Sequence, residues 1–207
     1  MDLIEAHLNY NNLKTTKQHG FTPKKSTTTN LIEALNIWSE ALSHGLPVDI
    51  IYLDYEKAFD KVPHHRLVLQ LSKYGITGDI LNWIEDYLHN RTQKVRVNGS
   101  FSKTSPVKSG VPQGSVLGPA LFLIFVADVA EIIQNFISLY ADDSKLFSYI
   151  LDSHDHQHTQ LSIQEDINTL CQWSDRMQMS FNVDKCHRLH LGHSNTEFHY
   201  TLPKVSD

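Results

Sequence analysis

The chain has 207 residues, of which 41% are hydrophobic and 20% are charged, so it can bury one substantial core and wholesale disorder is excluded. Its net charge of −5 argues against nucleic-acid binding, for which basic domains are the usual footprint. The longest apolar run, Ala120 to Ala127, is too short to span a bilayer, and no basic segment opens the chain as in a signal peptide. Cys171 and Cys186 form no metal-ligand spacing and are interpreted as reduced thiols of an intracellular protein.

The first predicted elements are a loop and a helix. The stretch up to Lys17 is polar and weakly patterned, and a loop punctuated by glycine and proline follows from Gln18 to Ser26. Ser26 can cap the next helix, and Gly45 is expected to end it. One face of this helix is expected to carry the apolar residues Leu31, Leu35, Trp38 and Leu42.

A buried strand is predicted over Val48–Leu53, and it ends at Asp54. Asp60 and Pro63 then suit a helix start, because a capping carboxylate and a first-turn proline are both favourable there. A carboxylate where a strand gives way to a helix is a common starting point for a functional site. The helix itself is expected to end at Gly75 after an apolar stripe of Leu67, Leu71 and Tyr74.

A second helix is predicted from Asp79 to Asn90, with Ile80, Trp83, Ile84 and Tyr87 in the core. A hairpin from Arg91 to Val107 follows, and its turn is Asn98-Gly99. Positions 91–108 carry no acidic residue and five basic ones, Arg91, Lys94, Arg96, Lys103 and Lys108. Such a strip can follow phosphates, although a solvated hairpin with basic residues on its open face explains it equally well.

Residues 109–119 contain three glycines and two prolines, which indicates a loop of fixed shape. Gln113 at its centre offers donors and an acceptor to a base or sugar. A helix from Ala120 to about Ile133 is expected to lead into the apolar run Phe136–Tyr140. A second apolar run, Leu146–Tyr149, completes a predicted hairpin with adjacent aspartates, Asp142 and Asp143, at its tip.

The last predicted elements are a helix of about Gln160 to Met177, a turn at 182–185 and a strand from Arg188 to Leu191. The helix is expected to turn inward Leu161, Ile167, Leu170 and Trp173. The remainder from Gly192 is polar and is expected to fray.

Two of the predicted strands end in carboxylates, and this suggests a metal site. If they pair side by side, Asp54, Asp142 and Asp143 come together, although an acidic pair can also simply fill a solvated turn. Two like charges ~4 Å apart repel by about 4 kcal/mol at an effective dielectric constant near 20, so a cluster needs a cation. Oxygen ligands suit Mg²⁺, and two such ions can clamp the attacking and leaving oxygens of a phosphoryl transfer.

Several motifs occur in order between about Gln18 and about Gly192. They are Gln18-His19-Gly20-Phe21 with Ser26, residues 53–64, residues 110–119, Tyr140-Ala141-Asp142-Asp143, Trp173-Ser174 and residues 181–186. With these motifs the chain resembles the reverse transcriptase domain of non-LTR retrotransposons of the jockey or LINE kind. The family implies an α+β fold, the palm of a right-hand polymerase, in which helices back an antiparallel sheet.

The resemblance implies a role for each matching residue. Asp54, Asp142 and Asp143 would bind two Mg²⁺ ions, with Mn²⁺ as a possible substitute, and Lys185 would protonate the leaving pyrophosphate, although it also fits a plain surface lysine. Contacts with the incoming nucleotide are implied at Tyr55, Phe59, Gln113 and Gly114, Phe59 being the ring that excludes a 2′-hydroxyl. Nucleic-acid contacts are expected at Tyr140, Arg91, Lys94 and Arg96. The implied partners are an RNA template, a DNA primer and dNTPs, with no membrane.

The chain also departs from the family pattern. Thr22 stands where arginine is usual, Lys25 substitutes for another, and neither an earlier fingers strand nor a thumb is recognisable. The expected division is a partial fingers segment at 1–47, a palm at 48–192 with the basic hairpin at 91–108, and a polar tail at 193–207. A truncated palm that only binds nucleic acid or a partner stays an alternative, whereas Phe59 disfavours a viral RNA-directed RNA polymerase, which typically has aspartate there.

Overall fold

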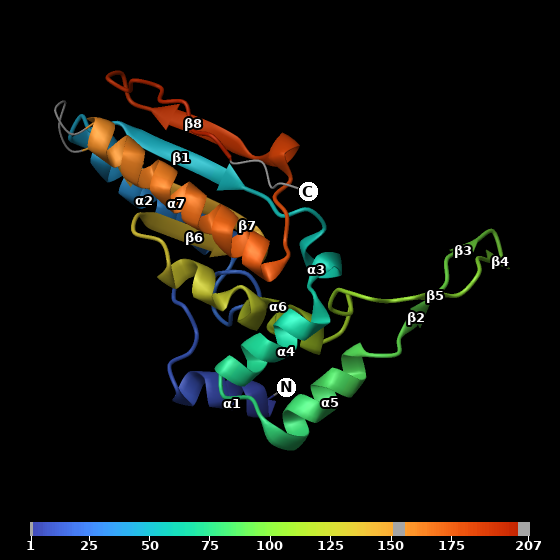
Figure 1. Ribbon diagram of the computed structural model, residues 1–207. Coiled ribbons are helices and arrows are strands. Elements are labelled where there is room, and N and C mark those ends of the chain that lie inside the picture. The colour runs from blue at the N-terminus through green and yellow to red at the C-terminus, as the bar shows by residue number, and fades with distance from the viewer. Residues whose placement is uncertain (1, 151–155, 203–207) are drawn as a thin grey trace. The chain divides into compact units, whose positions relative to one another are not determined.

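The computed structural model describes residues 2–150 and 156–202 (Figure 1). Its residues group into two compact units. The helical unit comprises Met1–Lys14 and Lys57–Val126, and the sheet unit comprises Thr15–Glu56 and Ala127–Asp207. In the structure the chain leaves the sheet unit after Glu56 and returns to it at Ala127. The division expected from the sequence, with boundaries at 47 and 192, stays a prediction.

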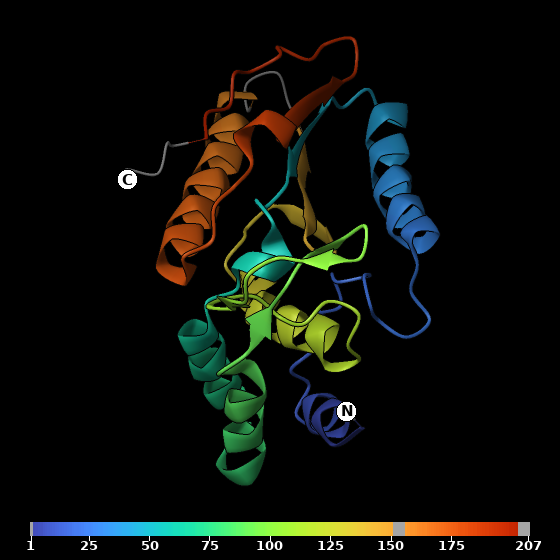
Figure 2. The same cartoon turned by 90° about the vertical axis from the view of Figure 1, so that its right-hand side faces the viewer.

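The sheet unit is built on one antiparallel sheet with the strand order β6-β7-β1-β8. The strands are β1 (Val48–Leu53), β6 (Phe136–Tyr140), β7 (Asp143–Tyr149) and β8 (His187–Leu191). Helix α2 (Thr27–Ser43) and helix α7 (His156–Met177) lie on opposite faces of this sheet (Figure 2). The short helices of the unit are the 3₁₀ turns η1 (Ala127–Glu131) and η2 (Val183–Lys185).

Strand β1 is buried on both faces, which explains its nearly continuous apolar sequence. On one face Val48 and Ile50 pack with Phe147 of β7 against Trp38 of α2. Trp38 meets the Phe147 ring edge-on at a centroid distance of 5.6 Å. The confirmed α+β architecture is thus held by helix–sheet packing on both sides of β1.

The buried face of α2 differs from the predicted one. Leu31, Leu35 and Leu42 are 50%, 50% and 37% exposed, and of the predicted stripe Trp38 alone is buried. The inward positions are Asn30, Ala34, Trp38 and Ala41. Small alanines let the helix approach the sheet, and Asn30 turns inward because its side chain donates to Ser138 Oγ, at 2.7 Å. The predicted ends are correct: Ser26 caps the helix, and Gly45 follows it with φ of 74°.

The helical unit contains five α-helices and a long hairpin within its described residues. The helices are α1 (Asp2–Tyr10), α3 (Ala58–Lys61), α4 (His64–Lys73), α5 (Gly78–Leu88) and α6 (Leu117–Phe125). The hairpin has paired strands β2 (Thr92–Gln93) with β5 (Ser105–Pro106), and β3 (Arg96–Val97) with β4 (Ser100–Phe101). Helix α1 was not predicted. It lies against the end of α4, where the imidazole Nε2 of its His7 is 2.8 Å from the Tyr74 carbonyl oxygen.

Three further predictions about helices are wrong in part. In α5, Ile84 is buried as expected, but Ile80 and Trp83 are 41% and 59% exposed because the buried stripe passes through Ile84 and Leu88. In α7, Leu161 is 48% exposed, whereas the other predicted core positions of that helix are buried. The expected helix from Ala120 to Ile133 is instead α6, ending at Phe125, followed by the 3₁₀ turn η1.

The described part of the predicted polar tail is anchored. The Tyr200 hydroxyl donates to the carboxylate of Asp49, which is fully buried at the start of β1, and the Asn195 amide donates to the same carboxylate at 2.8 Å. His190 Nδ1 completes the environment of Asp49, at 2.7 Å. Residues 203–207 lie outside the described part. No helix among the described residues is both long enough and apolar enough to cross a membrane.

Candidate active site

The acidic turn, defined as Tyr140–Asp143, joins β6 to β7. Tyr140 pairs with Asp143, so the loop contains two residues, Ala141 and Asp142. Ala141 has a φ of 54°, and Asp142 is not among the residues with positive φ, a pattern typical of a type II′ hairpin. Tyr140 is half-buried where the strand meets the turn. The predicted hairpin with carboxylates at its tip is therefore present.

Asp54 reaches the same end of the sheet through strand pairing. Strands β1 and β7 are antiparallel, and their last paired residues are Leu53 and Ser144. The next residue of each strand in this register is Asp54 on one side and Asp143 on the other. Strand pairing thus brings residues about ninety positions apart in the chain to one edge.

Lys185 comes to this edge from η2. Its Nζ lies 3.6 Å from Asp54 Oδ2, and its side chain is 64% exposed. The backbone fixes this approach, because the Asn182 N–H donates to the Asp54 carbonyl at 2.8 Å. A flexible, exposed ammonium beside a carboxylate is free to exchange that ion pair for another anion.

The electrostatics of the acidic turn disfavour negative charge. Burial is the main cause that raises the pKa of both Asp142 and Asp143, and the carboxylate of Asp54 raises both further. The Lys185 ammonium opposes the shift at both residues. A site that holds carboxylates near one another and partly out of water is a place where a cation gains affinity.

The donor set fits a hard divalent cation, since carboxylate oxygens are the ligands that Mg²⁺ and Mn²⁺ prefer. In the part of the chain that the structure describes, however, no three His, Cys, Asp or Glu side chains converge as ligands of one ion. The site is therefore a set of suitable donors rather than a closed cage.

Lys145 is a member of this site that sequence reasoning missed. It lies two residues after Asp143, is 7% exposed, and donates through Nζ to Asn30 Oδ1. Burial lowers the pKa of Lys145, and the Asp143 carboxylate opposes that shift. The one sequence signal is a lysine inside a strand whose neighbours Leu146 and Phe147 are apolar. Its partner is 115 residues away and cannot be predicted from that pattern.

The Tyr55 side chain is buried in the sheet unit. Its ring stacks on Phe181 at 4.5 Å between centroids and lies 6.1 Å from Trp173. The hydroxyl has no hydrogen-bond partner among the described residues, and burial strongly raises its pKa. A nucleotide contact at Tyr55 would therefore have to involve its backbone.

The other three predicted nucleotide-binding residues are Phe59, Gln113 and Gly114, and they belong to the helical unit. Hydrogen bonds there hold the loop around Gln113 against α3 and the residues next to it. The Val111 N–H donates to the Phe59 carbonyl at 2.8 Å, and the Gln113 Nε2 donates to Asp60 Oδ1 at 2.8 Å. The Phe59 ring stacks on Phe122 at 4.2 Å, which fixes its orientation. Gly114, exposed and with φ of 77°, turns the loop after Gln113.

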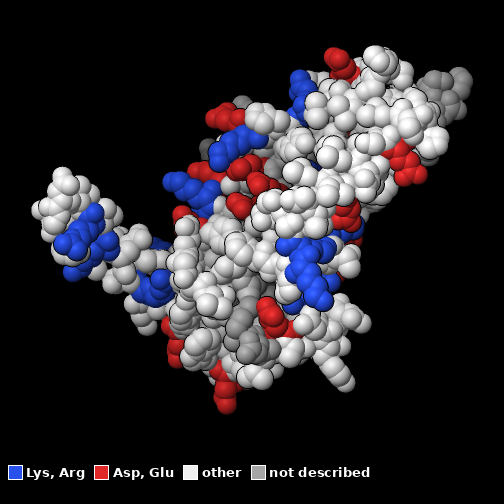
Figure 3. Space-filling model, turned by 180° about the vertical axis from the view of Figure 1, so that it is seen from behind, with Lys and Arg blue, Asp and Glu red and all other residues white. Residues whose placement is uncertain are grey.

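The predicted nucleic-acid-binding residues Arg91, Lys94 and Arg96 lie in or just before the hairpin. Lys94 and Arg96 are exposed, and basic side chains gather on the arm seen at the left of Figure 3. The Arg96 guanidinium lies 5.4 Å from the centroid of the Phe101 ring, itself 64% exposed. A basic strip with an accessible aromatic ring can contact phosphates and unstacked bases.

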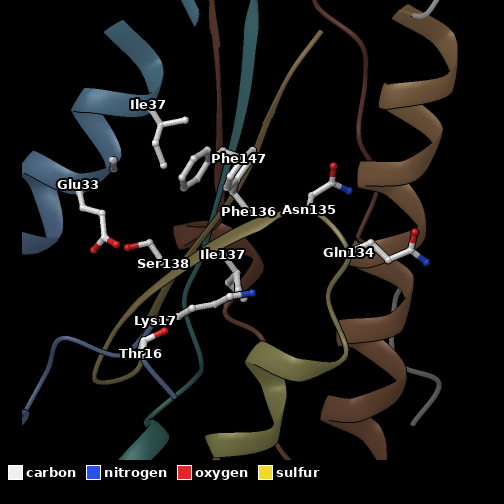
Figure 4. A pocket seen from close by; sticks show the side chains of 11 residues that line it. Thr16, Lys17, Glu33, Ile37, Gln134, Asn135, Phe136, Ile137, Ser138 and Phe147 are labelled. Atoms are coloured by element: carbon white, nitrogen blue, oxygen red, sulfur yellow. The ribbon is translucent and has the colours of Figure 1, made fainter. Parts of the chain in front are cut away.

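A cavity of about 530 Å³ lies elsewhere in the sheet unit, between α2 and β6 (Figure 4). Ile37 and Phe147 form part of its apolar wall, and Glu33 and Lys17 bring charge to it. None of the predicted site residues lines it.

Comparisons with known proteins show the family to which the chain belongs. The family described as "Reverse transcriptase (RNA-dependent DNA polymerase)" matches residues 2–201. The chain is 30% identical over 177 residues to the RNA-directed DNA polymerase from mobile element jockey of Drosophila melanogaster, covering 82% of this chain and 19% of that protein. It is 29% identical over 182 residues to the probable RNA-directed DNA polymerase from transposon BS of the same fly, with 81% and 19% covered. The chain thus spans about a fifth of the length of these relatives.

Solved structures show the same fold. Apo telomerase from Candida tropicalis, truncated from its C-terminal domain, superposes with a TM-score of 0.65 at 13% identity, covering 95% of this chain and 40% of that one. Telomerase from Candida albicans in complex with a TWJ fragment of telomeric RNA gives 0.65 at 13%, with 93% and 35% covered. This likeness supports a polymerase palm, and the family match covers nearly the whole sequence. The chain belongs to the reverse transcriptase family of RNA-dependent DNA polymerases.

Proposed function

We propose that this chain is the polymerase domain of a mobile-element reverse transcriptase, which extends a DNA primer on an RNA template with dNTPs. The observation that carries the proposal is the strand register that brings Asp54 to the edge where Asp142 and Asp143 lie. Reverse transcriptases generally use divalent metal ions, and these oxygen donors match that requirement. Similarity to telomerase that was solved in complex with a fragment of telomeric RNA supports nucleic acid as the partner.

In the proposed mechanism the protein positions reactants and does little covalent work. Asp54, Asp142 and Asp143 would hold two Mg²⁺ ions, which when bound neutralise charge on the reacting phosphate and lower the pKa of the attacking hydroxyl. The primer 3′-hydroxyl loses its proton to solvent, and its oxygen attacks the α-phosphorus of the dNTP. The bond from that phosphorus to the oxygen bridging to the β-phosphate breaks, and pyrophosphate leaves. Lys185 would donate a proton to that leaving oxygen, a role its exposed, mobile ammonium suits.

The helical unit would supply selection of the nucleotide. Phe59, whose ring is fixed by stacking on Phe122, would exclude a ribose 2′-hydroxyl. Gln113, held by Asp60, would contact the incoming nucleotide and template, and Gly114 turns the loop directly after it. For this step Phe59→Ala is expected to raise ribonucleotide incorporation relative to deoxynucleotide by about tenfold or more, measured by competition in primer extension.

Primer extension on an RNA template tests the proposal. The wild-type chain, with dNTPs and Mg²⁺, is expected to extend a DNA primer, whereas the Asp142→Asn/Asp143→Asn variant is not. Extension by the variant would overturn the metal assignment, and failure of the wild type to extend would overturn polymerase activity of this chain.

A second candidate function is nucleic-acid binding without synthesis, and the exposed basic hairpin favours it. In that case the wild type binds a primer–template duplex but never extends it. The Asp142→Asn/Asp143→Asn variant then binds the duplex equally well or more tightly, because two negative charges are removed. Binding by fluorescence anisotropy, measured on the samples used for extension, separates the two functions.

A further inference from the structure

The segment Lys17–Gly20 lies directly beside the acidic turn. Gln18 and Leu139 form a parallel bridge, in which the His19 N–H donates to the Leu139 carbonyl at 2.9 Å. In return the Leu139 N–H donates to the Lys17 carbonyl at 3.0 Å. Figure 4 shows the approach to this segment, where Thr16 and Lys17 lie close to Ile137 and Ser138 of β6. The segment therefore covers the edge of β6 close to Asp142.

The Gln18 side chain is bonded to both backbone groups of Ala141. Its Oε1 accepts from the Ala141 N–H at 2.8 Å, and its Nε2 donates to the Ala141 carbonyl at 3.2 Å. The same Oε1 accepts from the Gly20 N–H at 2.7 Å. Gln18 is 5% exposed, so its amide group has little contact with water. These three hydrogen bonds are called the Gln18 clamp.

Ala141, whose backbone groups Gln18 binds, has an unfavourable backbone conformation. Ala141 has φ of 54°, a conformation that residues with a side chain rarely adopt, and it directly precedes Asp142. A glycine at this position would adopt it without strain, but the chain has alanine. External hydrogen bonds to both its N–H and its C=O can hold such a peptide in place.

Gly20 allows the clamp to approach so closely. A Cβ atom on Gly20 would lie 2.3 Å from the Ala141 nitrogen and 2.9 Å from its Cα, far inside van der Waals contact. The segment Lys17–Gly20 is also bonded to helix α2. The His19 imidazole contacts Thr29 Oγ1 at 3.0 Å and Glu33 Oε2 at 2.7 Å, both on that helix. Helix α2 thus fastens the segment, and the segment fastens the acidic turn.

We propose that Gln18 is a positioning residue of the polymerase centre: by bonding both backbone groups of Ala141 it holds the turn that carries Asp142 and Asp143. This inference rests on the proposed function and adds a residue that touches neither nucleotide nor metal. Because a misplacement of about 1 Å can cost roughly 100-fold in rate, loss of the clamp should lower the rate of chemistry more than substrate binding.

The first test uses Gln18→Met, which keeps the length of the side chain and removes all three hydrogen bonds. The kcat for primer extension is expected to fall about 10- to 100-fold, with the KM for dNTP changed less than about twofold. The matched control is Gln160→Met, since Gln160 is also buried in the sheet unit at 4% exposure, and it donates to Thr196 rather than to the turn. Equal kcat values for the two variants would overturn the proposal.

The second test is rescue. Adding Ala141→Gly to Gln18→Met should restore at least several-fold of the lost kcat, because glycine adopts positive φ without the clamp. A buried amide with a merely structural role would not be rescued by a glycine in the turn. The absence of any rescue would therefore overturn the positioning role.

The third test does not depend on activity. Amide hydrogen exchange, followed by NMR on the protein without metal, should show the Ala141 N–H exchanging at least about tenfold faster in Gln18→Met than in Gln160→Met. Unchanged exchange would overturn the clamp itself. If the wild type extends no primer, the proposed function fails, while this measurement still decides whether Gln18 holds the turn.

Discussion

Two hairpins of this protein have two-residue turns whose conformations are stabilised in different ways. The hairpin between β3 and β4 uses Asn98 and Gly99, with φ of 49° and 84°, and these residue types adopt positive φ readily. The acidic turn has Ala141 at φ of 54°, and its conformation is supported by Gln18, 123 positions earlier. The first turn is determined locally, whereas the second depends on tertiary contacts. Two of the three carboxylates proposed for catalysis, Asp142 and Asp143, lie on the hairpin that the rest of the sheet unit holds.

The largest expected effect concerns Asp54, the carboxylate that strand pairing brings beside the acidic turn. Asp54→Asn removes one carboxylate from the edge beside the acidic turn, and the rate of extension should fall roughly 1,000-fold or more, since metal-assisted charge stabilisation is worth several kcal/mol. The control is Asp184→Asn, an exposed carboxylate next to Lys185 that has no assigned role. Single-turnover extension measures both variants, and a loss below tenfold for Asp54→Asn would exclude it as a metal ligand.

A second comparison concerns stability. Leu146 in β7 is fully buried, so Leu146→Ala should lower the free energy of unfolding by about 2–5 kcal/mol. Val97 in β3 is 62% exposed, and Val97→Ala should change it by less than about 0.5 kcal/mol. Urea denaturation followed by circular dichroism measures both. Similar losses would mean that the basic hairpin packs against something in solution.

The fold was predictable wherever a local pattern decides it. The apolar run of β1, the Ser26 cap and the Asn98-Gly99 turn all follow from neighbouring residues, and the structure confirms them. The buried faces of α2 and α5 were not predictable, because these helices carry more apolar residues than a neighbouring element covers. Trp83 at 59% exposure, stacked on Tyr87 at 5.7 Å, is an example.

The candidate site was predictable in its acidic residues and not in their support. Asp54 follows β1, Asp143 begins β7 and Asp142 directly precedes it, so pairing alone brings the three to one edge. Gln18, Asn30 and Lys145 act through partners more than 100 positions away, and no periodicity reports such contacts. The residues expected to do chemistry were visible in the sequence, whereas those that hold them became visible in the structure.

The basic hairpin should affect binding rather than chemistry. Lys94→Ala/Arg96→Ala removes two exposed cations, and the slope of log K against log salt for single-stranded RNA should become about 1–1.5 less negative. The kcat for extension at saturating template should stay within about twofold. Fluorescence anisotropy at several salt concentrations measures the slope, with Lys14→Ala, another exposed lysine, as control. An unchanged slope would remove the hairpin from the nucleic-acid interface.

The smallest expected effect is the change in stability when the charge of Asp142 is removed from the acidic turn. Burial raises the pKa of Asp142 above its ordinary value, with help from the carboxylates of Asp143 and Asp54, so the folded state disfavours the charged form. For a carboxyl group shifted in this direction, stability is lost as pH rises from the unfolded pKa through the folded one. Asp142→Asn removes that loss, so it should raise the melting temperature at pH 7 although the proposed mechanism expects it to abolish synthesis.

The gain should be about 2 °C, because this turn is half-exposed and solvent screens its charges. It should vanish below the ordinary carboxyl pKa, where the wild-type side chain is neutral in both states. Differential scanning calorimetry from pH 3 to 8 measures the difference, with Asp184→Asn as an exposed control. A melting temperature that falls at pH 7 would mean that the Asp142 carboxylate stabilises the turn. The acidic turn would then need no cation to tolerate its charge.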